Sequence, residues 1–202
     1  GVDHPAVQRG LQFLRDEQEA DGSWWGRWGV NYIYGTSAAL PAFRALGEDM
    51  RADHILKAAD WIVDKQNDDG GWGESCGSYM DPRLAGRGAS TASQTAWALM
   101  ALLAVGRPED DKVIRRGLSY LTANQEHGTW NEPFFTGTGF PGYGIGGRIN
   151  IRKASLSEDL QQSVELSRAF MINYNLYRHY FPVMAMGRAR AYLDRKSNVA
   201  ST

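Results

Sequence analysis

The sequence predicts an all-α protein built from pairs of helices. Three observations support this fold class. Apolar residues recur at helical spacing in several segments, each such segment ends in a motif of glutamine, glycine and tryptophan, and segments rich in small residues lie between the motifs. The chain has 202 residues, of which 43% are hydrophobic and 22% charged, a composition typical of a globular protein with a sizeable core. We therefore expect αα-hairpins, each with an outer and an inner helix, as in an α/α barrel or solenoid.

Three amphipathic segments are the expected outer helices. Each is followed by a Q-x-x-x-G-x-W motif, complete at residues 18–24 and 66–72 and one residue shorter at 125–130. The tryptophans of the motif are 48 and 58 residues apart, and such a period indicates a repeat architecture. The apolar residues with helical spacing are Val7, Leu11 and Leu14; Ile55, Ala59 and Ile62; and Val113, Gly117, Tyr120 and Leu121.

The repeated motif has a structural interpretation. Glycine adopts left-handed backbone angles without steric cost and so stops a helix, and the indole then folds back as an apolar plate with one N–H to satisfy. The glutamine can pair with free backbone groups at the helix end. We therefore predict that the motif clamps one helix to the next and takes no part in chemistry. Its residues are Gln18, Gly22, Trp24, Gln66, Gly70, Trp72, Gln125, Gly128 and Trp130.

The expected inner helices span residues 36–46 and 89–103, where Ala, Ser and Thr are frequent. Small side chains on every face suit a helix that packs closely on several neighbours. Gly47 and Gly106 stand where these two helices should stop.

A last helix is expected near the end of the sequence. Pro182 is its expected first residue, because proline favours the first helical position, and Arg195 lies near its expected end. Residues 196–202 are expected to be a disordered tail. No sheet is expected, although residues 148–152 alternate and could form a short extended piece.

Charge and composition exclude several classes of function. The formal net charge of -1 offers no basic face for nucleic acid. The single cysteine, Cys76, is expected to be an ordinary buried residue and fits a reducing compartment. The four histidines lack ligand spacing, so no zinc site is expected. The most apolar stretch, residues 92–105, is too short to span a bilayer.

Several longer strings are similar to the C-terminal part of the squalene-hopene cyclases. The similarity runs from Gln8 to about Leu193, and the strings follow the family's order. They are GRWGVNYIYG at residues 26–35, DGGWGES at 69–75, GTGFPG at 137–142, YNLYRHYFP at 174–182 and MAMGR at 184–188.

The resemblance implies a fold, a reaction and a location. Residues 1–195 would form about half of an α/α barrel of the α6-α6 type within a longer enzyme. That enzyme would protonate squalene, an apolar C30 substrate, and guide it through carbocations to hopene or hopanol in hopanoid biosynthesis, without a metal or cofactor. It would lie peripherally on the cytoplasmic face of a bacterial membrane and form a homo-oligomer, whereas the isolated chain would be soluble.

The acid that starts the family's reaction is missing from this sequence. In the family, the acid is the middle aspartate of a D-x-D-D motif, and no such motif occurs in residues 1–202. The nearest string, PEDD at 108–111, is interpreted as a solvated helix start, where the helix dipole favours acidic residues. We therefore expect that the chain is a piece of a longer protein, that its partner is the missing N-terminal part, and that it is inactive alone.

The residues expected to face the substrate are aromatic. Aromatic faces attract a carbocation without forming a bond to it, with about 0.5–2 kcal/mol per contact. The spacing of residues 170, 174, 177 and 181 further predicts a single helical stripe. Trp61 and Trp97 are expected to be core residues. By motif, the resemblance assigns the cavity wall to Trp28, Tyr34, Gly139, Phe140, Phe170, Tyr174 and Tyr177.

Three other interpretations remain open. A glycan-processing α/α barrel needs two carboxylates across a cleft, which Asp21, Asp68, Asp69 and Glu74 could supply, although capping also explains them. A protein-prenylating barrel needs a zinc set, for which Cys76 lacks a matching histidine. The chain could also be a non-catalytic helical scaffold.

Overall fold

The computed structural model is mainly helical and describes residues 1–139 and 170–200, with only the backbone given for Phe170 and for residues 195–200. The predictions for Phe140, for residues 148–152 and for residues 201–202 lie outside this part. The α-helices of the described part are α1 (Pro5–Asp16), α2 (Tyr32–Ala45), α3 (Asp53–Asp64), α4 (Ala92–Val105), α5 (Asp111–Ala123) and α6 (Tyr177–Ala200). Short 3₁₀ turns span Cys76–Tyr79, Pro82–Leu84 and Pro108–Asp110.

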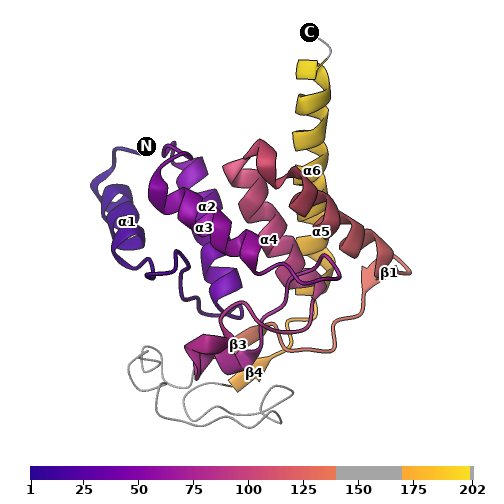
Figure 1. Ribbon diagram of the computed structural model, residues 1–202. Helices are drawn as coiled ribbons and strands as arrows, with labels where there is room; N and C mark the ends of the chain where they lie inside the picture. Colours follow the sequence, from indigo (N-terminus) through magenta and orange to yellow (C-terminus); the bar gives the residue numbers. More distant parts are fainter. Residues whose placement is uncertain (140–169, 201–202) are drawn as a thin grey trace.

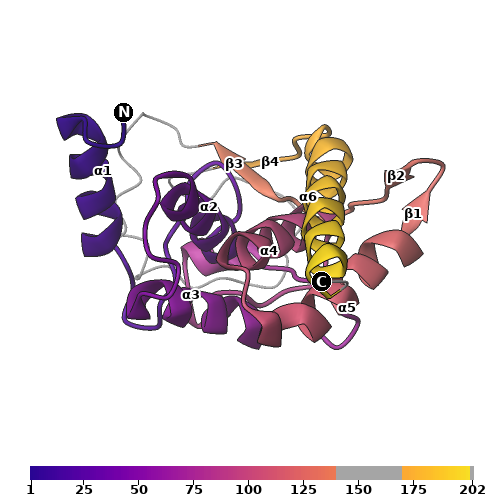
Figure 2. The same cartoon turned by 90° about the horizontal axis from the view of Figure 1, so that it is seen from above.

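The helices form two rows (Figure 2). Helices α2, α4 and α6 lie side by side in one row, and α3 and α5 lie along the other. Helix α4 is the centre of the arrangement, because it packs on α2, α6, α3 and α5. The chain therefore alternates between an outer and an inner helix, as the pattern of amphipathic and small-residue segments predicts.

Helix α4 is the core of the molecule. Every residue from Ala92 to Leu102 is buried, which explains why this helix has small side chains on all faces. The hydroxyl of Thr91 accepts a hydrogen bond from the N–H of Gln94, and Gly106 ends the helix in a left-handed conformation with φ of 75°. This inner helix is confirmed, with both ends displaced by two or three residues from the expected ones.

The tryptophans of the three motifs each tie down the end of an outer helix. In every copy the indole N–H donates to the carbonyl of the third residue from the end of the preceding helix, one of the carbonyls that a helix end leaves free. The pairs are Trp24 with Leu14 (2.6 Å), Trp72 with Ile62 (2.7 Å) and Trp130 with Leu121 (2.7 Å). The glycines that precede them have φ of 98°, 88° and 79°, so each turn requires the left-handed backbone that glycine allows.

The glutamines connect neighbouring outer helices in the first two copies. The amide group of Gln18 donates to the carbonyl of His54 at the start of α3, and that of Gln66 donates to the carbonyl of Val113 at the start of α5. Each amide also donates to the carbonyl of its own motif's glycine. The third copy differs, because the shortened motif forms a hairpin in which Gln125 is exposed and pairs with Trp130.

Two short antiparallel pairs correct the expectation of a chain without sheet. Strands β1 (Gln125–Glu126) and β2 (Thr129–Trp130) form a tight hairpin whose two turn residues, 127 and 128, both have positive φ. Strand β3 (Gly137–Gly139) pairs with β4 (Phe170–Ile172) below the start of α6 (Figure 1). The strands have two or three residues each, and β3 reads Gly-Thr-Gly, so no alternating pattern indicates them.

Helix α6 differs from the expected last helix at both ends. It begins at Tyr177, so Pro182 lies inside it, and it continues to Ala200 instead of ending near Arg195. Aromatic packing of its first turn on α4 holds the residues before the proline in the helix, and no glycine or proline after Gly187 stops it. Phe170 lies in β4 and Tyr174 in the irregular segment between β4 and α6, so the predicted helical stripe from 170 to 181 is wrong. Among the helices described, none is both long and apolar enough to cross a bilayer.

Candidate functional site

A cluster of aromatic rings lies where the three inner helices meet. Trp97 of α4 is its centre, with ring centroids 4.9 Å from Tyr34 of α2, 5.7 Å from Tyr177 and 5.3 Å from Phe181 of α6. Tyr174, just before α6, stacks on Tyr177 at 4.7 Å with an angle of 26° between the planes. The cluster therefore contains three of the residues that the family resemblance assigns to the cavity wall.

Trp97 links these rings, although the sequence suggests only a core role for it. Its side chain is buried, as expected, but three of its edge contacts are to rings of the cluster. A ring in the middle of the inner helix α4 can touch both neighbouring inner helices at once. Its position between two tyrosine-bearing segments could be recognised only once the order of the inner helices was known.

The backbone of Trp28 is hydrogen-bonded to strand β3 near the aromatic cluster. It has a φ of 71°, a left-handed conformation that costs a non-glycine residue about 1 kcal/mol or more and is often found at functional sites. Its carbonyl accepts a hydrogen bond from Thr138 of β3 at 2.9 Å, which fixes this conformation. The Trp28 side chain remains 37% exposed.

Strands β3 and β4 bring two further predicted residues together. Gly139 and Phe170 are direct partners in the register of this pair. Their separation in the sequence is 31 positions, so only the strand pairing reveals that they are neighbours. The backbone of residues 28–30 also pairs with β3, which places Trp28, Gly139 and Phe170 on one small sheet.

Burial keeps two tyrosines of the cluster, Tyr34 and Tyr177, neutral at physiological pH. Burial raises the pKa of Tyr34 and of Tyr177, and the nearby tyrosine hydroxyls raise both further. Burial also raises the pKa of Tyr180, whose ring lies 5.9 Å from that of Tyr177. Tyr34, Tyr177 and Tyr180 therefore present aromatic faces and neutral hydroxyls, without a phenolate charge that could trap a cation.

A buried carboxylate orients the helix that carries Tyr34. Glu74 is 4% exposed and accepts hydrogen bonds from the first N–H groups of α2, those of Asn31 (3.2 Å), Tyr32 (3.1 Å) and Ile33 (2.7 Å). Burial raises the pKa of the Glu74 carboxyl, and the hydrogen bonds act in the opposite direction. The sequence indicates a capping role for Glu74, but not that the helix it caps lies more than 40 residues earlier.

The next repeat also has a buried glutamate that caps the start of an inner helix. Glu132 accepts hydrogen bonds from the N–H and the hydroxyl of Ser93 at the start of α4. Both glutamates stand two residues after the motif tryptophan, and the first motif has Gly26 at this position. A shared Trp-x-Glu spacing is the sequence signal that could have revealed this cap.

An apolar cavity of about 240 Å³ opens between the inner helices beside the aromatic cluster. Its lining is mainly apolar and includes rings from all three inner helices. The lining residues are Tyr34, Ser37, Ala38, Pro41, Trp97, Met100, Phe181, Met184 and Arg188.

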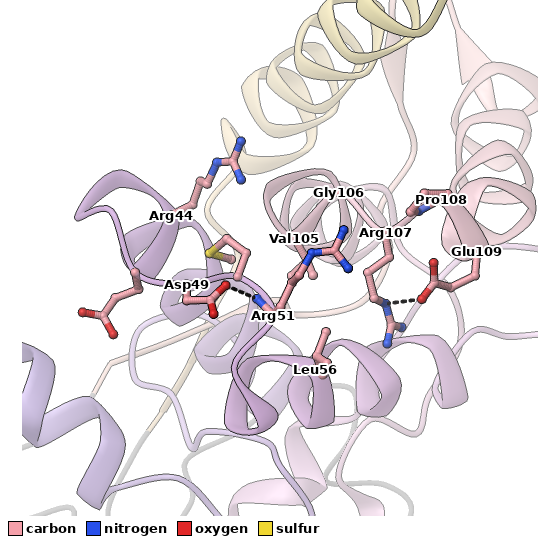
Figure 3. A pocket seen from close by; sticks show the side chains of 11 residues that line it. Arg44, Asp49, Arg51, Leu56, Val105, Gly106, Arg107, Pro108 and Glu109 are labelled. Carbon is pink, nitrogen blue, oxygen red and sulfur yellow. Dashed lines mark hydrogen bonds and ion pairs between the residues drawn. The ribbon is translucent and has the colours of Figure 1, made fainter.

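A second cavity, of about 460 Å³, has a different character (Figure 3). It lies at the other ends of α2 and α4, and three arginines and three acidic residues line it. Arg107 lies 4.0 Å from Glu109 at one side of it, and the main-chain N–H of Arg51 donates to Asp49. With balanced charges, this cavity does not suit an apolar guest.

Asp110, in the PEDD string beside that cavity, corrects one prediction. It is 3% exposed and receives two hydrogen bonds of 2.9 Å from the Arg107 guanidinium. Burial raises the pKa of its carboxyl, although Arg107 acts in the opposite direction. The expectation of a solvated helix start is therefore wrong for Asp110, because the preceding arginine folds over it.

Other candidate groups serve the framework. Asp21 accepts hydrogen bonds from Ser23 and from the indole N–H of Trp61, and Asp69 accepts from Gly71 and Ser90. Cys76 is buried, and burial raises its pKa to about 12. In the part of the chain that the structure describes, no group of three or more His, Cys, Asp or Glu side chains could hold a metal ion.

The fold and the site define a helical-repeat protein with neutral aromatic rings gathered beside an apolar cavity, and the comparisons agree with this class. Residues 1–145 match the family model of the squalene-hopene cyclase C-terminal domain, so the chain belongs to this family. It is 47% identical over 191 residues to a squalene–hopene cyclase of Alicyclobacillus acidocaldarius and 42% identical over 193 residues to one of Zymomonas mobilis. Both alignments cover 94% of this chain but only 26% and 25% of the relative.

The relatives also include a plant enzyme of another name. The chain is 39% identical over 203 residues to a dammaradiene synthase of Dryopteris crassirhizoma, with 94% of this chain and 26% of the relative covered. The chain thus spans about a quarter of the length of each of these three relatives. The family resemblance drawn from the motifs is confirmed.

Proposed function

We propose that this chain forms part of the wall of the cavity in which a longer enzyme cyclises squalene to hopene or hopanol. The observation that supports this most directly is the cluster of Tyr34, Trp97, Tyr174 and Tyr177. Its rings come from three separate elements and contact one another, and burial keeps Tyr34 and Tyr177 neutral at physiological pH. Any apolar side chains can fill a protein core. A cavity that holds a carbocation instead needs aromatic faces, which attract the cation without forming a bond to it.

The cluster would act on the intermediates and not on the first step. Each ring that faces a developing cation contributes about 0.5–2 kcal/mol, and several in succession would favour the path to the full set of rings. The protonating acid would come from a D-x-D-D motif in the rest of the enzyme, since residues 1–202 contain none. The wall would consist of Trp28, Tyr34, Gly139, Phe140, Phe170, Tyr174 and Tyr177.

The remaining architecture follows from the same proposal. The alternation of outer and inner helices supports a barrel of the α6-α6 type, of which residues 1–195 would supply about half. The rest of the same enzyme would close the barrel and the cavity. We further propose a peripheral position on the cytoplasmic face of a bacterial membrane, from which an apolar substrate can enter, and a homo-oligomeric state for the whole enzyme.

The experiment is an incubation of the full-length enzyme with squalene, followed by mass spectrometry of the products. We expect pentacyclic hopene or hopanol from the full-length enzyme and no conversion by residues 1–202 alone. Conversion by the chain alone would contradict the assignment of the acid to the missing part. A full-length enzyme that leaves squalene unchanged would favour the alternative of a non-catalytic helical scaffold.

A further inference from the structure

Two glycines face each other where the segment before α2 pairs with β3. Gly29 and Gly137 form an antiparallel bridge. Hydrogen bonds lie on either side of this pair and none lies within it, so it is a non-hydrogen-bonded pair, with Cα atoms about 4.5 Å apart and with any side chains close together on one face. The flanking bonds run from the N–H of Val30 to the carbonyl of Thr136 (3.0 Å) and from the N–H of Thr138 to the carbonyl of Trp28 (2.9 Å).

Tyrosine rings occupy the places of the two missing side chains. A Cβ atom on Gly29 would lie 2.8 Å from Cε2 of Tyr34 and closer still to Cγ and Cδ2. A Cβ atom on Gly137 would lie 2.6 Å from Cε2 of Tyr174 and closer to Cδ2. Ordinary contacts begin at 3.4 Å. Because paired residues project to the same face of a sheet, the two rings lie side by side on a backbone surface that only glycine leaves open.

Each ring also contacts a second ring of the cluster, which limits how it can move away from this surface. The Tyr34 ring is bounded by Trp97, at 4.9 Å between centroids, and by Gly26, whose Cβ position lies 3.0 Å from the other ring edge. The Tyr174 ring is stacked on Tyr177 at 4.7 Å. The contact on Tyr34 includes Cγ, the ring atom bonded to Cβ. Rotation of the ring about the Cβ–Cγ bond does not move this atom and so cannot relieve the contact.

We propose that Gly29 and Gly137 are positioning residues of the cyclisation cavity, which set the distance of Tyr34 and Tyr174 from the intermediate cations. The inference rests on the proposed function. Moving Cε2 of Tyr174 from 2.6 Å to an ordinary 3.4 Å contact takes about 0.8 Å, and the closer Cδ2 requires more. A misplacement of about 1 Å can change a rate by about 100-fold. A cation that has lost its ring contact then gives up a proton to water, and the C–H electron pair forms an alkene with fewer rings.

The test compares four alanine variants of the full-length enzyme that contains this chain. Gly29→Ala and Gly137→Ala should raise the ratio of prematurely terminated to pentacyclic products by about 2- to 30-fold, the range expected for one weakened cation–ring contact. Gly117→Ala is the matched control for crowding, because its Cβ would meet Trp72 (2.7 Å) and Leu99 (2.8 Å) away from the site. It should lower the melting temperature and leave the product ratio unchanged. Gly187→Ala, with open space around it inside α6, should leave the product ratio unchanged and should not lower the melting temperature, because alanine favours a helix more than glycine does.

A paired variant keeps the test decisive if a single variant fails to fold. Removing the ring with Tyr174→Ala relieves the two closest contacts of the methyl group and leaves the Ile172 carbonyl at 3.1 Å. Adding Gly137→Ala to it should therefore lower the melting temperature less than Gly137→Ala does alone, and should not change the products further. An unchanged ratio in folded Gly29→Ala and Gly137→Ala, or a loss of melting temperature in the pair as large as that of Gly137→Ala alone, would overturn the inference. If the unmodified enzyme gives no product from squalene, the proposed function is wrong. The melting temperatures of the variants then still show whether Gly29 and Gly137 leave the space that the Tyr34 and Tyr174 rings occupy.

Discussion

Replacing Glu74 by glutamine should destabilise the protein, because a single acceptor oxygen cannot serve three donors. Oε2 accepts from Asn31 and Ile33, and Oε1 accepts from Tyr32. If the glutamine oxygen takes the place of Oε2, its amide group faces the Tyr32 N–H. One buried N–H then loses its acceptor, at a cost of about 1–3 kcal/mol, and the buried amide group loses a similar amount.

The removal of a buried charge offsets part of this loss, since burial raises the pKa of Glu74. We therefore expect a net loss of about 2 kcal/mol in the free energy of unfolding, which corresponds to a fall of about 4–8 °C in the melting temperature of a chain of this length. The assay is thermal unfolding of the 202-residue chain followed by circular dichroism at 222 nm. Glu126→Gln on exposed strand β1 is the control and should melt like the unmodified chain. A Glu74→Gln variant that melts within about 1 °C of the unmodified chain would refute the role of this carboxylate as a cap.

Three further predictions concern the framework. Trp72→Phe removes the indole N–H and leaves a void, so it should lower the free energy of unfolding in urea by about 2–4 kcal/mol. Trp28→Phe changes an exposed ring and should lower it by less than about 1 kcal/mol. Equal losses in the two variants would contradict the role of Trp72 as a clamp. Asp110→Asn should cost about 1–3 kcal/mol by weakening the bidentate pair with Arg107, and high salt should not reproduce this loss. Burial raises the pKa of Tyr120 to about 12, so the neutral hydroxyl contributes fully to the stability of the fold below pH 10, and this contribution is lost as the pH rises through 12. Tyr120→Phe should therefore reduce the loss of stability at alkaline pH, which a pH series of melting curves measures.

The sequence reveals the helical framework because its signals are local. Apolar spacing and a glycine stop mark each outer helix, and α4 shows its central position through small residues on every face. The start of α2 lies four residues before the expected Thr36, since its cap is Glu74 from a distant turn. Such a cap leaves no mark in the sequence next to the helix.

The candidate site depends on contacts that are distant in the sequence. The motifs select Tyr34, Tyr174 and Tyr177, but nothing in their spacing shows that Trp97 joins them. The pairing of β3 with β4 spans about thirty positions and uses strands too short for periodicity. The start of α6 five residues before Pro182 likewise depends on packing against α4, which overrides the usual position of proline.

The central claim is that the aromatic faces of this chain guide a carbocation, and the product spectrum of two substitutions at Tyr177 tests it most directly. In the full-length enzyme supplied with squalene, Tyr177→Ala should give ring systems that terminate early, whereas Tyr177→Phe, which keeps the aromatic face and loses only a neutral hydroxyl, should retain the pentacyclic products. A Tyr177→Ala enzyme with the unmodified product spectrum would contradict the claim.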